Sequence, residues 1–322
     1  MQVKAPDRTA ADHRAGPEER PARRSRTTRP LWRSRRTLQG IGYAAPTAVY
    51  VAVFFVLPLL LVGQMSLHDW PLIAGDRGRN APENFTDVTD STLFWPAVRF
   101  TLLYTAIVTV VLLGLALLLA LLVQESRPGA GFLRTIYFLP GALGLASASL
   151  LFWGLYSPTT GPLSRALEKL GLVDDPVSFL GTPTSALLST VFLVVWKFAG
   201  FYMLILLVGL QRIPHELYEA ARMDGASRGQ IFRRITLPLL RPSLALSLLL
   251  CVTGSLLAFD QFFVLTKGGP DNSTVTIVQL IYREAFQRLN LGTAAALSIL
   301  VLAALLLLNA AQFRGLHRAD ES

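Results

Sequence analysis

Two ionisable side chains, Lys197 and Asp260, lie inside or at the end of long apolar stretches of this 322-residue chain. Lys197 follows Trp196, and Asp260 is followed by Gln261. A charge in apolar surroundings is costly and usually faces a cavity or a partner group, so these residues are candidates for binding a polar ligand. A lysine can also extend its long stem to a membrane interface instead, and both interpretations stay open.

The residue types that metal or nucleotide chemistry needs are sparse. The single cysteine, Cys251, excludes an intramolecular disulfide, and the four histidines are scattered without the spacing of metal ligands. The chain contains no GxxxxGK[ST], GxSxG or HExxH motif. We therefore expect no metal site, no catalytic residues and no cofactor on this chain, and any nucleotide chemistry must belong to another chain.

Charge is distributed as in a membrane protein. Only 16% of the residues are charged, whereas soluble proteins have about 25%. An apolar helix of about 20 residues spans a bilayer, and six stretches with few charges are long enough. They lie near residues 41–65, 100–123, 133–156, 186–209, 241–262 and 290–312. The sequence predicts an all-α polytopic membrane protein with six transmembrane helices, in which Pro140 is expected to bend the third.

The basic residues predict the orientation of these helices. The loops and ends on the side that holds both termini contain 21 Lys and Arg residues, and the loops on the other side contain seven. Because basic loops stay in the cytoplasm, we expect both termini to be cytoplasmic.

The ends of the chain are expected to lie outside the membrane domain. Residues 1–40 are rich in Arg, Pro, Ser and Ala and predict a disordered basic tail. Residues 41–312 form the predicted membrane domain, and residues 313–322 a second cytoplasmic tail. The net charge of +9 could suggest a nucleic-acid partner. Orientation and attraction to anionic membrane lipid explain this charge better, so we expect no nucleic acid.

The polar stretch between the fourth and fifth spans, residues 211–240, predicts two short helices. Pro214 suits the start of the first helix, and Gly225 tolerates the left-handed conformation that ends it. Ser227 and Gln230 have the spacing of a capping box for the second helix. Pro238 is expected to break that helix before the membrane.

This loop resembles a known family motif. Its residues match the EAA---G---------I-LP pattern of ATP-binding-cassette (ABC) importer permeases at every specified position: Glu219, Ala220, Ala221, Gly225, Ile235, Leu237 and Pro238. The resemblance implies that these residues form a helical hairpin that inserts into a cleft on the ATP-hydrolysing subunit and transmits its closure to the spans.

The resemblance covers residues 41–312. Phe259-Asp260, residues 264–270 and residues 281–286 are similar to the carbohydrate branch of these permeases, as are residues 66–70 and Asn84-Phe85. Within that branch the chain resembles the maltose and glycerol-phosphate type. The resemblance implies a permease in a bacterial cell membrane that works with a second permease, a dimer of ATP-binding subunits carrying ATP and Mg, and an extracytoplasmic sugar-binding protein.

A sugar site should combine aromatic rings with a few polar groups. The candidates in spans four and five are Trp196, Lys197, Tyr202, Ser255, Phe259, Asp260 and Gln261. The sequence leaves open whether the cargo is a disaccharide, a longer oligosaccharide or a glycerol phosphodiester.

Two other classes of protein remain as alternatives. An ion-coupled secondary transporter would carry its own ion site and often has two inverted repeats, whereas this chain has no obvious duplication. A membrane-embedded enzyme would need converging acidic or histidine side chains in the spans. Copurification of an ATPase with this chain would separate the permease from both.

Overall fold

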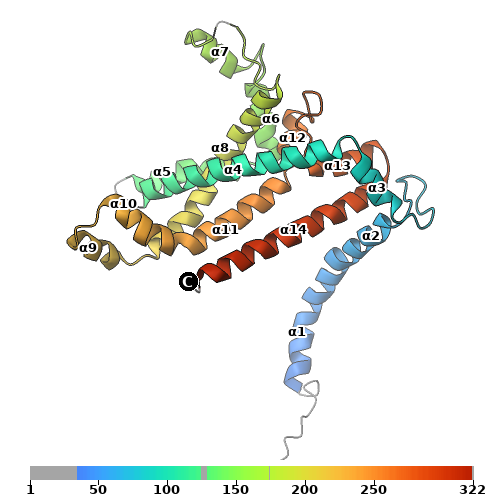
Figure 1. Cartoon of the computed structure of the whole chain (residues 1–322), viewed down its shortest axis with the longest axis horizontal. Coiled ribbons are helices and arrows are strands. Elements are labelled where there is room, and N and C mark those ends of the chain that lie inside the picture. The colour runs from blue at the N-terminus through green and yellow to red at the C-terminus, as the bar shows by residue number, and fades with distance from the viewer. Residues whose placement is uncertain (1–34, 125–128, 174, 321–322) are drawn as a thin grey trace, which may run out of the picture. The chain divides into compact units, whose positions relative to one another are not determined.

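The computed structural model describes residues 35–124, 129–173 and 175–320, and these residues are almost entirely helical. Within these ranges the only β-structure consists of two isolated bridges, His68 with Arg79 and Pro71 with Asn290. The chain forms two compact units, residues 1–56 and 57–322, which are described separately. The all-α class predicted from the sequence is confirmed (Figure 1).

The described part of the first unit consists of α1 (Arg35–Val51) and the π-helical turn η2 (Ala52–Val56). Helix α1 begins within the segment that the sequence predicted as a disordered tail, and it contains Pro46. The rest of the predicted tail, residues 1–34, lies outside the described residues.

The second unit contains the remaining helices, most of which are labelled in Figure 1. In chain order they are α2 (Leu57–Ser66), α3 (Glu83–Asp90), α4 (Phe94–Val123), α5 (Ala130–Phe138), η3 (Leu139–Ala142), α6 (Leu145–Leu155), α7 (Pro162–Lys169), α8 (Pro183–Gln211), α9 (His215–Met223), α10 (Arg228–Ile231), η4 (Phe232–Thr236), α11 (Leu237–Leu256), α12 (Asp260–Leu265), α13 (Ile277–Tyr282), η5 (Arg283–Gln287) and α14 (Leu291–Asp320). The tail predicted from residue 313 continues α14 as far as Asp320.

Five helical segments of the described chain are long and apolar enough to cross a membrane. They are Gly42–Ser66, Phe94–Val123, Pro183–Gln211, Arg228–Leu265 and Leu291–Arg314. The third predicted span, 133–156, is not one straight helix, because α5 with η3 meets α6 at an angle of 93°. The structure therefore has five such helices, or six spans if this bent pair counts as one.

The bend follows from the residues at its centre. Pro140 has no backbone N–H to continue the helical hydrogen bonds. Leu143 and Gly144 then adopt extended conformations before α6 begins. A break in a membrane helix frees backbone carbonyl groups, and these must find partners inside the protein.

Two prolines follow π-helical turns without ending the helix. Pro58 comes after η2 and Pro238 after η4, each at the second position of the next α-helix. In η4 the N–H of Leu237 donates to the carbonyl of Phe232, one residue further back than in an α-helix. The sequence-based expectation that Pro238 breaks the helix was wrong, because the wider turn accommodates the proline ring.

The main core lies between α4 and α8, with α6, α11 and α12 packed around them. Small residues allow this close packing: Ala116 and Ala120 of α4 are fully buried. A Cβ atom at Gly200 of α8 would collide with the backbone carbonyl of Tyr137 in α5. Helix α8 is therefore fixed directly against the helix that precedes the bend.

Candidate functional site

The loop that matches the family pattern is a helical hairpin. Helix α9 ends at Asp224-Gly225, where Gly225 has a φ of +74°. The Ala226 N–H donates to the Ala221 carbonyl (2.9 Å), which closes the end of α9 in the way typical of a glycine-terminated helix. The predicted left-handed glycine is confirmed.

The second arm of the hairpin begins with the predicted capping box. The Gln230 N–H donates to Ser227 Oγ (3.4 Å), and the Ser227 N–H donates to Gln230 Oε1 (2.7 Å). The hydroxyl groups of Tyr218 and Thr236 lie 3.3 Å apart and link α9 to the base of the hairpin. Because η4 continues into α11, the second arm is the first part of a membrane-spanning helix.

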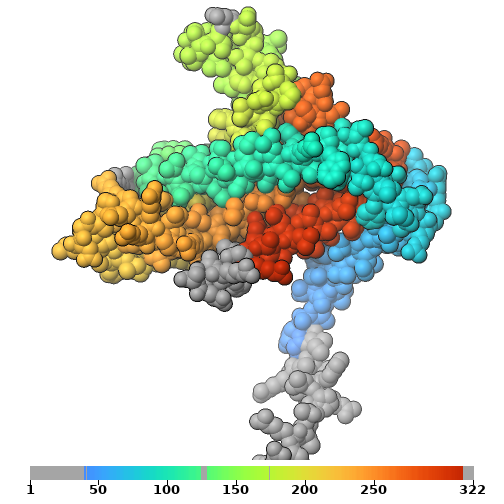
Figure 2. All heavy atoms as spheres, viewed as in Figure 1, coloured from blue at the N-terminus to red at the C-terminus, as the bar shows by residue number. Residues whose placement is uncertain are grey.

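The outer face of the hairpin carries apolar and acidic side chains that solvent reaches. Glu219 is 65% exposed, with its Oε1 3.1 Å from Nδ1 of His215. Met223 is 88% exposed, and Leu217 is also exposed. Figure 2 shows the hairpin projecting beyond the end of α11. Such an exposed apolar patch on a polar loop is typical of a surface that binds another protein.

The matching residues divide between two parts of this hairpin. Glu219 and Ala220 are exposed on α9, and Ala221 and Gly225 line a shallow hollow between the arms with a volume of about 340 Å³. Ile235 lies in the same hollow, whereas Leu237 and Pro238 are half-buried at the base. Their contact with an ATP-hydrolysing subunit stays a prediction.

A second feature is a cavity of about 180 Å³ between α4, α6, α8, α11 and α12. Five of the seven residues predicted to bind cargo line it together: Tyr202, Ser255, Phe259, Asp260 and Gln261. The other lining residues are Tyr104, Val108, Leu112, Leu145, Val194, Phe198, Cys251, Gly254, Leu257 and Ala258. The cavity thus combines aromatic rings with a few polar groups, as a binding site for a small polar molecule does.

Helix α11 ends at Leu256, so Asp260 and Gln261 do not belong to the helix of the fifth predicted span. The sequence placed both residues at the end of the fifth span, whereas the structure places them in the first turn of α12. Asp260 is exposed, and Gln261 is buried with its Nε2 donating to the hydroxyl of Tyr104 (3.0 Å). The break between the two helices therefore presents both polar side chains to the cavity.

Phe259 connects the cavity to a group of aromatic rings on α12 and α13. Its ring stacks on Phe263 with centroids 5.0 Å apart and lies 5.5 Å from the ring of Tyr282. Phe262, the next residue after Gln261, faces the opposite way and packs against Phe100 and Tyr104 in the core. One face of α12 thus belongs to the core and the other to the aromatic group.

Trp196 and Lys197 do not line this cavity. The Trp196 ring packs 5.1 Å from that of Phe152. Lys197 is 4% exposed, and its Nζ donates to the carbonyls of Leu143 (2.6 Å) and Gly141 (3.3 Å). These are carbonyl groups freed by the break before α6, so the amine satisfies backbone groups. A cargo contact of either residue stays a prediction.

Tyr104 lines the cavity but was not among the site residues predicted from the sequence. It is fully buried in the first half of α4 and orients Gln261. A lone tyrosine in the stretch 100–123 was the available signal, but the sequence does not reveal that α4 faces α12.

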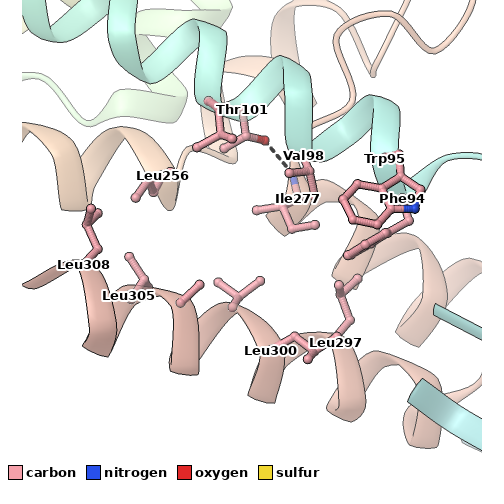
Figure 3. A pocket seen from close by; sticks show the side chains of 13 residues that line it. Phe94, Trp95, Val98, Thr101, Leu256, Ile277, Leu297, Leu300, Leu305 and Leu308 are labelled. Atoms are coloured by element: carbon pink, nitrogen blue, oxygen red, sulfur yellow. Dashed lines mark hydrogen bonds between the residues drawn. The ribbon is translucent and has the colours of Figure 1, made fainter. Parts of the chain in front are cut away.

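Another pocket, of about 350 Å³, lies between α4 and α14 (Figure 3). Its walls are apolar except for Thr101, whose Oγ1 donates to Ala97 O (2.7 Å) and accepts from the N–H of Ile277 (3.0 Å). Because Thr101 is already engaged in hydrogen bonds, this pocket offers a polar cargo few partners. Within the described ranges, no group of three or more His, Cys, Asp or Glu side chains is placed to hold a metal ion.

Comparisons with known proteins place the chain in a family. Residues 107–314 match the family model described as "Binding-protein-dependent transport system inner membrane component". The trehalose/maltose transport system permease protein MalF of Thermococcus litoralis is 36% identical over 258 residues, which are 79% of this chain and 85% of that protein. The diacetylchitobiose uptake system permease protein NgcF of Streptomyces coelicolor is 33% identical over 84% of this chain and 80% of that protein.

A solved structure has the same fold. A chain from the crystal structure of a bacterial ABC transporter that imports the acidic polysaccharide alginate superposes with a TM-score of 0.77 and 25% identity. The match covers 88% of this chain and 99% of that chain. The motif, the helical fold and these relatives agree: the chain is a multi-pass membrane protein that belongs to the family of binding-protein-dependent transport system inner membrane components.

Proposed function

We propose that this chain is one of two transmembrane permease subunits of an ATP-driven sugar importer. An extracytoplasmic binding protein delivers the sugar, and a dimer of separate ATP-binding subunits holds ATP and Mg. The two permeases and the ABC transporter named above serve trehalose or maltose, diacetylchitobiose and alginate, which are all carbohydrates. The chain itself acts as a transport subunit without a nucleotide site.

The observation that carries this proposal is the continuity of one helical segment. Residues Arg228–Leu265 run from the second arm of the hairpin through η4 and α11 to α12, with one break after Leu256. Ser255 at one end of α11 lines the cavity, and Ile235 near the other end lines the hollow of the hairpin. A movement of the hairpin on the ATP-binding subunit would therefore be transmitted to the cavity wall by a rigid element.

The cavity gives the sugar its contacts. The ring of Phe259 offers an apolar face to the C–H groups of a sugar, while Ser255, Asp260 and Gln261 offer partners to its hydroxyl groups. The cavity is small, so it would hold one part of an oligosaccharide at a time.

Phe259→Ala is expected to raise the sugar concentration for half-maximal uptake by about 3- to 10-fold, because ring stacking contributes about 0.5–1.5 kcal/mol. Uptake would be measured in liposomes that hold the complete importer, its binding protein outside and ATP inside. Phe286→Ala is the matched control, since Phe286 is 58% exposed and lies outside the cavity lining. Equal half-saturation in the two variants would exclude Phe259 as a cargo contact.

We also propose that both termini face the cytoplasm, following the excess of basic residues on that side. After replacement of Cys251, a cysteine at Gly16 should react with an impermeant thiol reagent only in opened cells. A cysteine at Leu170, an exposed residue after α7, should react in intact cells. Labelling of both positions from outside would contradict this orientation.

A further inference from the structure

In the part of the chain that the structure describes, the lining of the cavity above carries a negative charge and no positive charge. Asp260 is the only residue with a formal charge in its described lining, which contains no lysine or arginine. This carboxylate is exposed in the first turn of α12. Any cargo that enters the cavity therefore meets a negative group without a positive one beside it.

Gln261 adds a second acceptor. The residue is 3% exposed, and its Nε2 donates to the hydroxyl of Tyr104. Among the described residues, its Oε1 atom is buried and has no hydrogen-bond partner. A buried acceptor without a partner costs free energy, and a donor group on a bound molecule would relieve that cost.

Lys197 precedes the lining residue Phe198 in the sequence, and its amine is directed to backbone carbonyls. Its Nζ donates to Leu143 O and Gly141 O and lies 4.7 Å from the ring centroid of Phe198. Phe198 lines the cavity, whereas Lys197 does not. The charge of Lys197 therefore stabilises the break before α6 and does not belong to the lining of this cavity.

We infer that this cavity selects sugars without negative charge, whose hydroxyl groups donate hydrogen bonds to Asp260 and Gln261. A carboxylate, phosphate or sulfonate on the cargo would be repelled by Asp260 and could not donate to the Gln261 carbonyl oxygen. This inference rests on the proposed sugar import and adds the charge class of the cargo. It excludes acidic sugars and a glycerol phosphodiester as cargo of this cavity.

The first test identifies the cargo. The binding protein that copurifies with the importer is screened for thermal stabilisation by maltose, trehalose and N,N'-diacetylchitobiose, and by glycerol 3-phosphate and alginate trisaccharide. Mass spectrometry then identifies the compound that the complete importer accumulates in liposomes. We expect an uncharged sugar. An accumulated sugar with a carboxylate, phosphate or sulfonate overturns the inference but keeps the proposed function, whereas a compound that is not a sugar overturns both.

The second test asks whether Asp260 and Gln261 of the permease itself contribute to binding of the sugar. Asp260→Asn should raise the half-saturation concentration for the accumulated sugar by about 3- to 10-fold, since a hydrogen bond to a charged acceptor becomes a weaker bond to a neutral amide oxygen. Asp271→Asn removes an exposed carboxylate outside the cavity lining and should leave that concentration unchanged.

Gln261→Leu should also raise the half-saturation concentration for uptake of the sugar. Gln279→Leu is its control, because Gln279 is also buried with a free Oε1 in the described part of the chain but does not line the cavity. Unchanged half-saturation in both Asp260→Asn and Gln261→Leu would overturn the inference. These readouts do not depend on how much of each variant is assembled, since half-saturation is independent of the amount of protein.

Discussion

Glu219→Lys is expected to abolish sugar uptake and the stimulation of ATP hydrolysis by the loaded binding protein, while the permease still inserts into the membrane. Glu219 lies on the exposed face of α9 next to Ala220, where a partner can approach closely. A carboxylate there can pair with a basic group of the ATP-binding subunit. Truncation of a central interface anchor typically costs about 2–4 kcal/mol, and reversal of its charge adds repulsion. The measurement is the rate of ATP hydrolysis with and without loaded binding protein.

Gly225→Pro should have the same effect through the backbone. Proline requires a φ near −65°, whereas Gly225 has +74°. The turn that directs the second arm would therefore be lost. Gly229→Ala is the matched control in the same hairpin, because an added Cβ there has no described atom within 4 Å and the residue has an ordinary helical conformation. Normal stimulation in both Glu219→Lys and Gly225→Pro would mean that this hairpin is not the coupling element.

The second large effect is expected for Lys197→Met. The thioether keeps most of the volume of the side chain but leaves the carbonyls of Gly141 and Leu143 without their described donor. Each unsatisfied buried group costs about 1–3 kcal/mol, so the loss of the donor to both carbonyls should lower the free energy of unfolding by about 2–6 kcal/mol. The permease should unfold at a lower temperature in detergent. Spin labels would be placed at Leu150 on α6 and Val110 on α4, which are both exposed positions. The distribution of distances between the two labels should become broader.

Two variants make this second prediction specific. Lys197→Arg retains donors and should restore part of the stability and a narrow distance distribution. Arg99→Met removes an exposed cation of α4 and should change neither the melting temperature nor the distance distribution. If Lys197→Met gives the parent melting temperature and label distance, the amine does not hold the bend.

Local signals predicted the hairpin well. The capping box of Ser227 and Gln230 and the left-handed Gly225 depend on neighbours within a few residues, and the structure contains both. The apolar runs likewise predicted the membrane-spanning helices, because the length of a span is set by the thickness of the bilayer.

Tertiary contacts decided the features that the sequence did not reveal. Pro140 indicated a bend, but the angle of 93° depends on Gly200 and Lys197, which bring α8 against the break. Pro238 was expected to end a helix, and the preceding π-helical turn allows the helix to continue.

Only a part of the candidate site was predicted, because some of its residues meet through tertiary contacts. Ser255, Phe259, Asp260 and Gln261 lie within seven residues of one another, so their meeting at one cavity follows from a short stretch of chain. Tyr104 is more than 150 residues away from Gln261 in sequence. Its part in the cavity depends on the packing of α4 against α12, which a single sequence does not encode in any local pattern.

The central claim is that this chain imports sugar with energy from ATP hydrolysed on another subunit. The most direct measurement is accumulation of the identified sugar in liposomes that contain the complete importer, with its loaded binding protein outside. The account predicts accumulation when ATP and Mg are enclosed, none with a nonhydrolysable ATP analogue, and no response to an imposed ion gradient. Accumulation that follows an ion gradient without ATP would contradict the account and identify an ion-coupled secondary transporter.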